Sequence, residues 1–276
     1  MLLRKFAACG ALLLGSLATV AQTPQAIPAD AAKETVTKAA PGNSRWPTAA
    51  QALAISKGKQ VRVVLVGDST MQTNSGYGDG FCALVTADTA CINAGRGGRS
   101  TMSYRAEGAW QIILDYLGKL TPAERSKTWV LIQFGHNDMP GKPGRSTDLA
   151  TEFPANLHHY VQDLKTVGAN AVLVTALSRR SYKEGKIDNT LEPWAEATRK
   201  VAGDESVPLL DLNAESVAYL NKVGMTEADT LAVEPEPGPK FDRTHLGPKG
   251  AALFGKMVAR ELVAAVPELK SHFQIP

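Results

Sequence analysis

Four separate segments of the chain carry the residue types that an acyl-transfer site requires. Ser69 ends a Gly-Asp-Ser triplet, Gly98 ends a Gly-Gly pair, and Asn137 directly follows a histidine. Near the C-terminus, Asp242 precedes His245 by three residues. A serine hydroxyl becomes a good nucleophile when a nearby base takes its proton, and that base is usually an imidazole held by a carboxylate. These segments predict a catalytic Ser69, with His245 as its base and Asp242 orienting the ring.

Ser69 also has other interpretations. A serine after Gly-Asp at a strand end is commonly a turn residue or a helix N-cap. A strand-to-helix loop can instead bind phosphate through its backbone N–H groups, but neither nucleotide-binding glycine pattern occurs here. The segment departs from the G-x-S-x-G elbow as well, because Met71 stands where that motif requires glycine. An α/β-hydrolase of that type and a nucleotide site are therefore both disfavoured.

The five histidines differ in their fitness as the catalytic base. His245 is the best candidate, because the aspartate three residues before it can hold the ring. His136, beside the asparagine, either contacts substrate or only fixes its loop. We assign structural roles to His158 and His159, which lie within one expected helix, and to His272, which lies in a polar tail.

An ester-cleaving site must also stabilise the oxyanion of its tetrahedral intermediate with fixed hydrogen-bond donors. Gly98 can expose its backbone N–H without a side chain in the way, Asn137 can supply its side-chain amide, and Ser69 can supply its own N–H. Individually, the glycine pair is typical of an ordinary turn and the asparagine of a loop residue. We favour a common oxyanion hole, because each of these residues follows a different strand-like segment by a few positions.

Strand-like and helical patterns alternate along residues 46–276. Short apolar, β-branched runs predict strands at 61–66, 92–94, 130–134, 171–176 and 207–212. Helical periodicity predicts helices at 80–87, 104–117, 153–167, 192–201 and 247–266. Such alternation predicts a parallel sheet covered on both faces by helices. Ligands bind at the carboxyl ends of such strands, so the predicted site residues should gather at one edge of the sheet.

The N-terminal region is expected to lie outside the folded domain. Arg4 and Lys5 precede an apolar run that ends near Ala21, which is typical of a secretory signal over residues 1–21. A membrane anchor is disfavoured, because the run is shorter than the ~20 residues that span a bilayer. Residues 22–45 lack a sustained apolar period and are expected to be a flexible lead-in. We therefore expect an exported protein, periplasmic or extracellular, with no membrane anchor after signal cleavage.

Composition excludes several classes of partner. The chain has 30 basic and 27 acidic residues, and removal of residues 1–21 leaves 28 basic and 27 acidic. Because the cations are scattered, nucleic-acid binding is not expected. No spacing of His, Cys and Asp is typical of a metal site, so no metal or cofactor is expected. Beyond the signal only Cys82 and Cys91 remain; a disulfide and two free thiols are both open.

In its order of Ser69, Gly98, Asn137 and His245, the chain resembles the SGNH, or GDSL-type, hydrolase superfamily, with Asp242 at the position of its acid. The resemblance is closest to the rhamnogalacturonan acetylesterase branch. The local matches are Gly67-Asp68-Ser69-Thr70-Met71, Gly98-Arg99-Ser100, Ser103-Tyr104, Glu107-Gly108, Phe134-Gly135-His136-Asn137-Asp138 and Thr151-Glu152-Phe153-Pro154-Ala155-Asn156-Leu157. The resemblance as a whole extends from about Val61 to the last expected helix.

This resemblance implies a flavodoxin-like, three-layer α/β/α fold and metal-free removal of acetyl groups from a plant cell-wall polysaccharide, typically pectin. An acetylated polysaccharide or oligosaccharide is the expected partner, and a monomer is the expected state. Deacetylation of xylan or other glycans, and acyl transfer in the cell envelope, use the same residues and stay open. A mere binding module is disfavoured, because it would need neither Ser69 nor the Asp242 and His245 pair.

Overall fold

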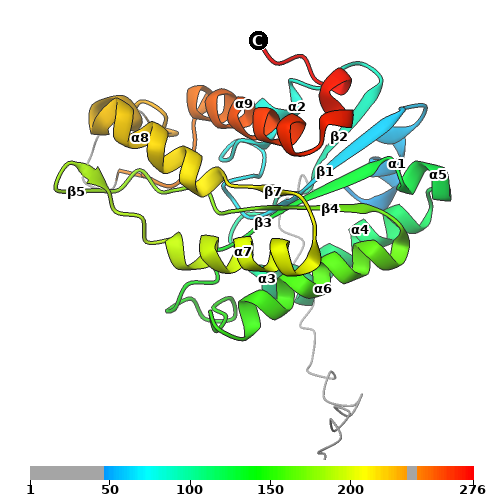
Figure 1. Ribbon diagram of the computed structural model, residues 1–276, viewed down its shortest axis with the longest axis horizontal. Coiled ribbons are helices and arrows are strands. Elements are labelled where there is room, and N and C mark those ends of the chain that lie inside the picture. Colours follow the sequence, from blue (N-terminus) through cyan, green and yellow to red (C-terminus); the bar gives the residue numbers. More distant parts are fainter. Residues whose placement is uncertain (1–46, 235–240) are drawn as a thin grey trace, which may run out of the picture. The chain divides into compact units, whose positions relative to one another are not determined.

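The computed structural model describes residues 47–234 and 241–276. The expected signal at 1–21 and lead-in at 22–45 lie outside the described residues. Within the described part, one sheet contains five parallel strands in the order β2-β1-β3-β4-β7 (Figure 1). The strands are β1 (Val61–Gly67), β2 (Thr89–Asn93), β3 (Thr128–Gln133), β4 (Asn170–Val174) and β7 (Leu209–Leu210). This order is flavodoxin-like and confirms the predicted fold class.

Helices cover both faces of the sheet, as the continuous apolar strands predict. All seven residues of β1 are buried; Val64 and Val66 join the core on one face, and Val63 and Leu65 join the core on the other. The first core is closed by α1 (Ala49–Ser56), α3 (Thr101–Ala106), α4 (Ala109–Gly118), α6 (Glu152–Val167) and α7 (Glu192–Glu205). The second is closed by α2 (Gly78–Cys82), α8 (Leu212–Asp229), α9 (Pro248–Ala265) and the 3₁₀ helix η1 (Pro267–His272) (Figure 1). A short α5 (Pro122–Arg125) and a hairpin of β5 (Tyr182–Lys183) and β6 (Lys186–Ile187) complete the described elements.

Most expected elements differ by a few residues from the observed ones, and three of these differences have a visible cause. The helix expected at 80–87 ends at Cys82, because Val85 pairs with Phe273 near the C-terminus instead of continuing the helix. The helix expected at 104–117 is two helices, separated at Gly108, whose φ of 79° ends the helical path. The strand expected at 207–212 is shorter, because the chain enters α8 at Leu212.

Helices α1, α5 and α8 were not expected from the sequence. In α8 the helical pattern is interrupted at Gly224, whose φ of 77° and ψ of 171° kink the helix. The Asp211 side chain caps the start of α8, a signal that the apolar run before it conceals. None of the helices in residues 47–234 and 241–276 is long and apolar enough to cross a membrane.

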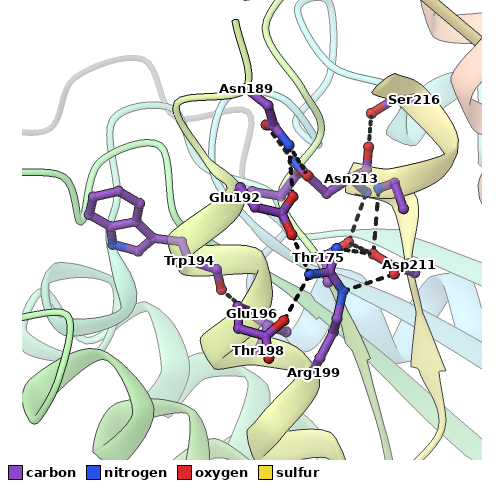
Figure 2. Close-up of polar contacts among 12 residues, drawn as sticks. Thr175, Asn189, Glu192, Trp194, Glu196, Thr198, Arg199, Asp211, Asn213 and Ser216 are labelled. Atoms are coloured by element: carbon purple, nitrogen blue, oxygen red, sulfur yellow. Dashed lines mark hydrogen bonds and ion pairs between the residues drawn. The ribbon is translucent and has the colours of Figure 1, made fainter. Parts of the chain in front are cut away.

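A polar network joins the carboxyl ends of β4 and β7 to α7 and α8 (Figure 2). Arg199 on α7 donates from Nε to Asp211 Oδ2 at 2.9 Å, and Thr175 Oγ1 donates to Asp211 Oδ1 at 3.0 Å. Asn213 Nδ2 donates to the Ala176 carbonyl oxygen at 2.8 Å. The network therefore holds the beginning of the loop that leaves β4, which contributes to the site described below.

A disulfide joins Cys82 at the end of α2 to Cys91 in β2, with Cα atoms 5.4 Å apart. Of the two states that the sequence left open, the structure contains the bonded one. The bridge ties α2, which follows the Ser69 loop, to the neighbouring strand of the sheet.

Candidate active site

The loop that carries Ser69 is held by hydrogen bonds from its own residues. Asp68 is fully buried, and its Oδ1 accepts from the backbone N–H and the hydroxyl of Thr70, both at 2.8 Å. Gln133 on β3 donates from Nε2 to Thr70 Oγ1 at 2.7 Å. Gly67 is required where the strand ends, because a Cβ there would lie 2.6 Å from the Gln133 carbonyl oxygen. These contacts place Ser69 at the switch point between β1 and β3.

Ser69, His245 and Asp242 form one chain of hydrogen bonds. The distance from Ser69 Oγ to His245 Nε2 is 2.8 Å, and from His245 Nδ1 to Asp242 Oδ2 it is 2.7 Å. Asp242 Oδ1 accepts from the N–H groups of Thr244 at 2.8 Å and His245 at 2.9 Å. When Nδ1–H donates to the carboxylate, Nε2 is left as the acceptor for the serine proton. The arrangement can therefore generate a serine nucleophile.

The carboxyl of Asp242 is held in its charged form. Burial raises its pKa, but the backbone and side-chain hydrogen bonds from His245 outweigh this, and the net pKa lies below the ordinary value. A charged carboxylate beside Nδ1 stabilises the imidazolium that forms when His245 takes a proton.

Arg180 fixes the backbone of the Asp242 and His245 loop, a role that the sequence analysis missed. Its side chain is fully buried, and Nη2 donates to the carbonyl oxygens of Asp242 at 2.9 Å and His245 at 2.7 Å. Its own N–H donates to the Arg243 carbonyl oxygen at 2.8 Å. Burial lowers the pKa of Arg180 to about 10, so it is still a cation at neutral pH. The one available sequence signal is a basic pair that begins three residues after the end of a predicted strand.

Gly98 and Asn137, the expected oxyanion donors, line the same cavity as Ser69. The φ of Gly98 is 78°, a conformation that favours glycine. Asn137 Nδ2 donates to the Arg99 carbonyl oxygen at 3.0 Å, while its Oδ1 lies 3.4 Å from Lys142 Nζ. These two contacts fix the amide, and its second N–H is available to a developing oxyanion.

His136 has a contact that fixes its loop, and its ring also lines the cavity. Its Nε2 lies 2.9 Å from the Leu177 carbonyl oxygen, so it is the donor there and fixes the loop. Burial lowers the pKa of His136 to about 4, so the ring is neutral and Nδ1 is an acceptor. Nδ1 has no hydrogen-bond partner among the described residues, and the ring lines the cavity.

The other histidines lie elsewhere, as expected of structural residues. His158 Nδ1 pairs with Glu205 at 2.7 Å between α6 and α7, and His272 Nδ1 lies 3.0 Å from Thr89 Oγ1. His159 is on α6 and is absent from the cavity lining. Within the described ranges, no group of three or more His, Cys, Asp or Glu side chains could hold a metal ion.

The cavity has a volume of about 440 Å³ and a polar wall. Its lining comes from four loops, those after β1, β2, β3 and β4, and from the segment before α9. The residues are Ser69, Gln72, Gly97, Gly98, His136, Asn137, Lys142, Arg145, Arg179, Asp242, Thr244 and His245. Such a volume accommodates a sugar-sized group beside the nucleophile.

Residues 65–253, more than half of the chain, match the GDSL-like lipase/acylhydrolase family. The chain belongs to this family and is a carboxylic ester hydrolase, which confirms the class that its four segments predicted.

One relative indicates a narrower group within this family. The chain is 31% identical over 229 residues to the rhamnogalacturonan acetylesterase RhgT of Bacillus subtilis strain 168, covering 78% of this chain and 94% of that protein. The resemblance to this branch is thereby confirmed.

Solved structures share the fold. The structure of YxiM from Bacillus subtilis has a TM-score of 0.62 at 20% identity, covering 78% of this chain and 59% of that one. A variant of an acetyl-xylooligosaccharide esterase from Geobacillus stearothermophilus has a TM-score of 0.53 at 18% identity, covering 76% of this chain and 96% of that one.

Proposed function

We propose that the protein is a serine esterase that removes O-acetyl groups from a plant cell-wall polysaccharide, rhamnogalacturonan. The observation that carries the proposal is the hydrogen-bonded series of Ser69, His245 and Asp242 at 2.8 and 2.7 Å on a sugar-sized cavity. The relative RhgT, named a rhamnogalacturonan acetylesterase, supports the substrate class.

In the proposed reaction, His245 takes the proton of Ser69 while Ser69 Oγ attacks the acetyl carbonyl carbon. The oxyanion that forms accepts hydrogen bonds from the N–H groups of Ser69 and Gly98 and from the Asn137 amide. His245 then gives its proton to the departing sugar oxygen, which leaves an acetyl group on Ser69. Water, activated by the same imidazole, attacks this acetyl-enzyme and releases acetate.

We also propose that the protein acts outside the cytoplasm. A polymeric cell-wall substrate is present only outside cells, and the basic and apolar N-terminus is typical of a secretory signal. The disulfide between Cys82 and Cys91 supports this compartment, because such bonds persist in oxidising environments. The N-terminal residue of protein recovered from the producing cell tests cleavage near Ala21, and an uncleaved N-terminus would contradict it.

Acetate release across a substrate panel tests the activity. Acetylated rhamnogalacturonan, acetylated homogalacturonan, acetylated xylan and a small aryl acetate are compared at equal acetyl concentration. We expect the highest kcat/KM on rhamnogalacturonan and none with Ser69→Ala on any substrate, since the hydroxyl forms the covalent intermediate. A preference for xylan would overturn the substrate, and acetate release by folded Ser69→Ala would overturn the mechanism. Transfer of acetyl to an added sugar, rather than to water, would identify an acyltransferase.

A further inference from the structure

Three cations line the active-site cavity without a carboxylate partner among the described residues: Lys142, Arg145 and Arg179. Lys142 Nζ lies 3.4 Å from Asn137 Oδ1, and Arg145 Nη1 lies 3.3 Å from the Gly98 carbonyl oxygen. Arg179 Nη1 lies 3.0 Å from the hydroxyl oxygen of Thr190 and 3.2 Å from the thioether sulfur of Met139. All three side chains are half-buried and contact only neutral acceptors.

Most half-buried arginines elsewhere in the described chain are paired differently. Four of them have a carboxylate oxygen within 3.1 Å, namely Arg99, Arg105, Arg199 and Arg243, as does the buried Arg62. Arg125 is an exception, because it donates to the Leu120 carbonyl oxygen. The fold therefore supplies carboxylates to most of its structural arginines, whereas the buried Arg180 binds backbone carbonyl oxygens. The three cations on the cavity wall have no carboxylate partner in residues 47–234 and 241–276, so a carboxylate of a bound ligand can take that place.

The loop between β3 and α6 holds two of these cations in place. Ser146 Oγ accepts from the Lys142 N–H at 2.8 Å and donates to the Met139 carbonyl oxygen at 2.8 Å. Thr147 Oγ1 donates to the buried Asp138 Oδ1 at 3.0 Å. A loop braced in this way presents its cations before any ligand arrives, which lowers the entropy cost of binding.

The loop after β4 holds the third cation. The N–H of Ser178, beside Arg179, donates to Ser216 Oγ at 3.1 Å, and Ser216 lies at the α8 end of the network in Figure 2. On the other side, Arg180 is bound to the loop of His245. Arg179 is thus fixed between the polar network and the candidate catalytic residues.

Without a bound anion, the positive charges of these three side chains repel one another. Burial lowers the pKa of Lys142, and the positive charges of Arg179 and Arg145 lower it further. The buried carboxyls of Asp68 and Asp138 act in the opposite direction, but Lys142 still has a pKa below the ordinary value. Among the described residues that line the cavity, the one carboxylate is that of the candidate triad, so this described part of the wall is cationic.

We propose that Lys142, Arg145 and Arg179 form a subsite for a carboxylate of the substrate, carried by a uronic-acid unit of the same oligosaccharide as the acetyl group. The inference rests on the proposed function and adds a determinant of specificity to it. A guanidinium can bind a carboxylate through two parallel N–H bonds, and an ammonium adds a point charge. Neutral glycans offer these cations no partner, so they should be the poorer substrates.

One pair of substrates isolates the charge. Acetylated rhamnogalacturonan oligosaccharides are compared with the same oligosaccharides after methyl esterification of their carboxylates, which keeps the acetyl groups. For the parent enzyme we expect kcat/KM to be about 10- to 100-fold higher on the acidic form, the range that charged hydrogen bonds typically supply. Rising salt should reduce this ratio, because it screens exposed charges.

Arg179→Gln and Arg145→Gln should each lower the ratio several-fold, mainly through KM on the acidic substrate. Lys119→Gln is the matched control: it removes one positive charge from an exposed position at the end of α4 and should leave the ratio at the parent value. Inhibition by unacetylated oligogalacturonate, compared with a sulfated oligosaccharide of equal charge, distinguishes carboxylate from sulfate binding.

Equal kcat/KM on the acidic and methyl-esterified forms would overturn the subsite and leave the proposed function intact. If this ratio were unaltered in both arginine variants, the preference for the acidic substrate would come from other residues, and the proposed subsite would be overturned. Stronger inhibition by the sulfated compound would also overturn the subsite. Absence of acetate release from every polysaccharide, with the aryl acetate still cleaved, would overturn the proposed function and the subsite together.

Discussion

Replacement of Arg180 by methionine should lower esterase activity, although the side chain does not contact the cavity. Arg180 binds the backbone on both sides of the hydrogen-bonded pair of Asp242 and His245. Methionine has a similar length and fills much of the same space, but it donates no hydrogen bond. The substitution therefore removes the donors while limiting the change in packing.

The magnitude follows from two opposing contributions. Each of the two short bonds from Nη2, at 2.9 and 2.7 Å, stabilises the loop by about 1.5–3 kcal/mol because the donor is charged. Burial of the cation opposes this: it lowers the pKa of Arg180 to about 10, and the shift from the ordinary value corresponds to about 3 kcal/mol. The net contribution is then about 0–3 kcal/mol. We use the upper part of this range, because methionine leaves the carbonyl oxygens of Asp242 and His245 without their donor. A loss of about 2–3 kcal/mol in loop closure lowers kcat/KM about 30- to 150-fold.

The assay is steady-state hydrolysis of a small aryl acetate, measured alongside thermal unfolding. Arg180→Lys retains the charge but not the fork of donors, so its kcat/KM should lie between those of the parent and the methionine variant. Arg105→Met serves as the control, because it removes an ion pair with Asp163 at 2.7 Å outside the cavity. It should lower the unfolding temperature and leave kcat/KM near the parent value.

A folded Arg180→Met enzyme with kcat/KM within twofold of the parent would refute the positioning role. So would an equal loss of kcat/KM per folded molecule in Arg105→Met, because general destabilisation would then explain both results.

Asn137→Ala should lower kcat about 10²–10³-fold and leave KM within a few fold, because the amide is proposed to bind charge that exists only in the transition state; unchanged kcat in steady-state kinetics would remove it from the oxyanion hole. Burial raises the pKa of Glu261 to about 8, against an ordinary value of 4.5. The folded state therefore keeps a proton that the unfolded state releases between these values, and stability falls as pH rises through this window. Glu261→Gln should unfold at a higher temperature than the parent near pH 9 and at the same temperature near pH 4; an equal gap at both would contradict this. Alkylation without reductant should label neither Cys82 nor Cys91, and Cys82→Ser should cost about 2–3 kcal/mol in urea unfolding for this short loop; two labelled thiols would rule out the bridge.

Local patterns in the sequence were sufficient for the sheet, and they singled out the candidate residues that the structure brings to one cavity. Buried parallel strands are continuous apolar runs, so β1 and β3 could be predicted from their local sequence. Helix α8 could not, because Gly224 interrupts its period and Asp211 follows an apolar run directly. The same holds for residues 84–86, which pair with the C-terminal segment, a contact that no local pattern encodes.

By itself, the sequence determined which residues could perform ester cleavage and which edge of the sheet should collect them, because strand ends and glycine turns are local properties. Only the tertiary structure decided that His245 lies 2.8 Å from Ser69, 176 residues earlier in the chain. It also decided that Arg180 holds that histidine's backbone and that Arg179, its neighbour, lines the cavity. Nothing in the local sequence distinguishes the roles of the adjacent Arg179 and Arg180. Their different roles depend on which loops pack against them, and packing between distant segments depends on the whole fold.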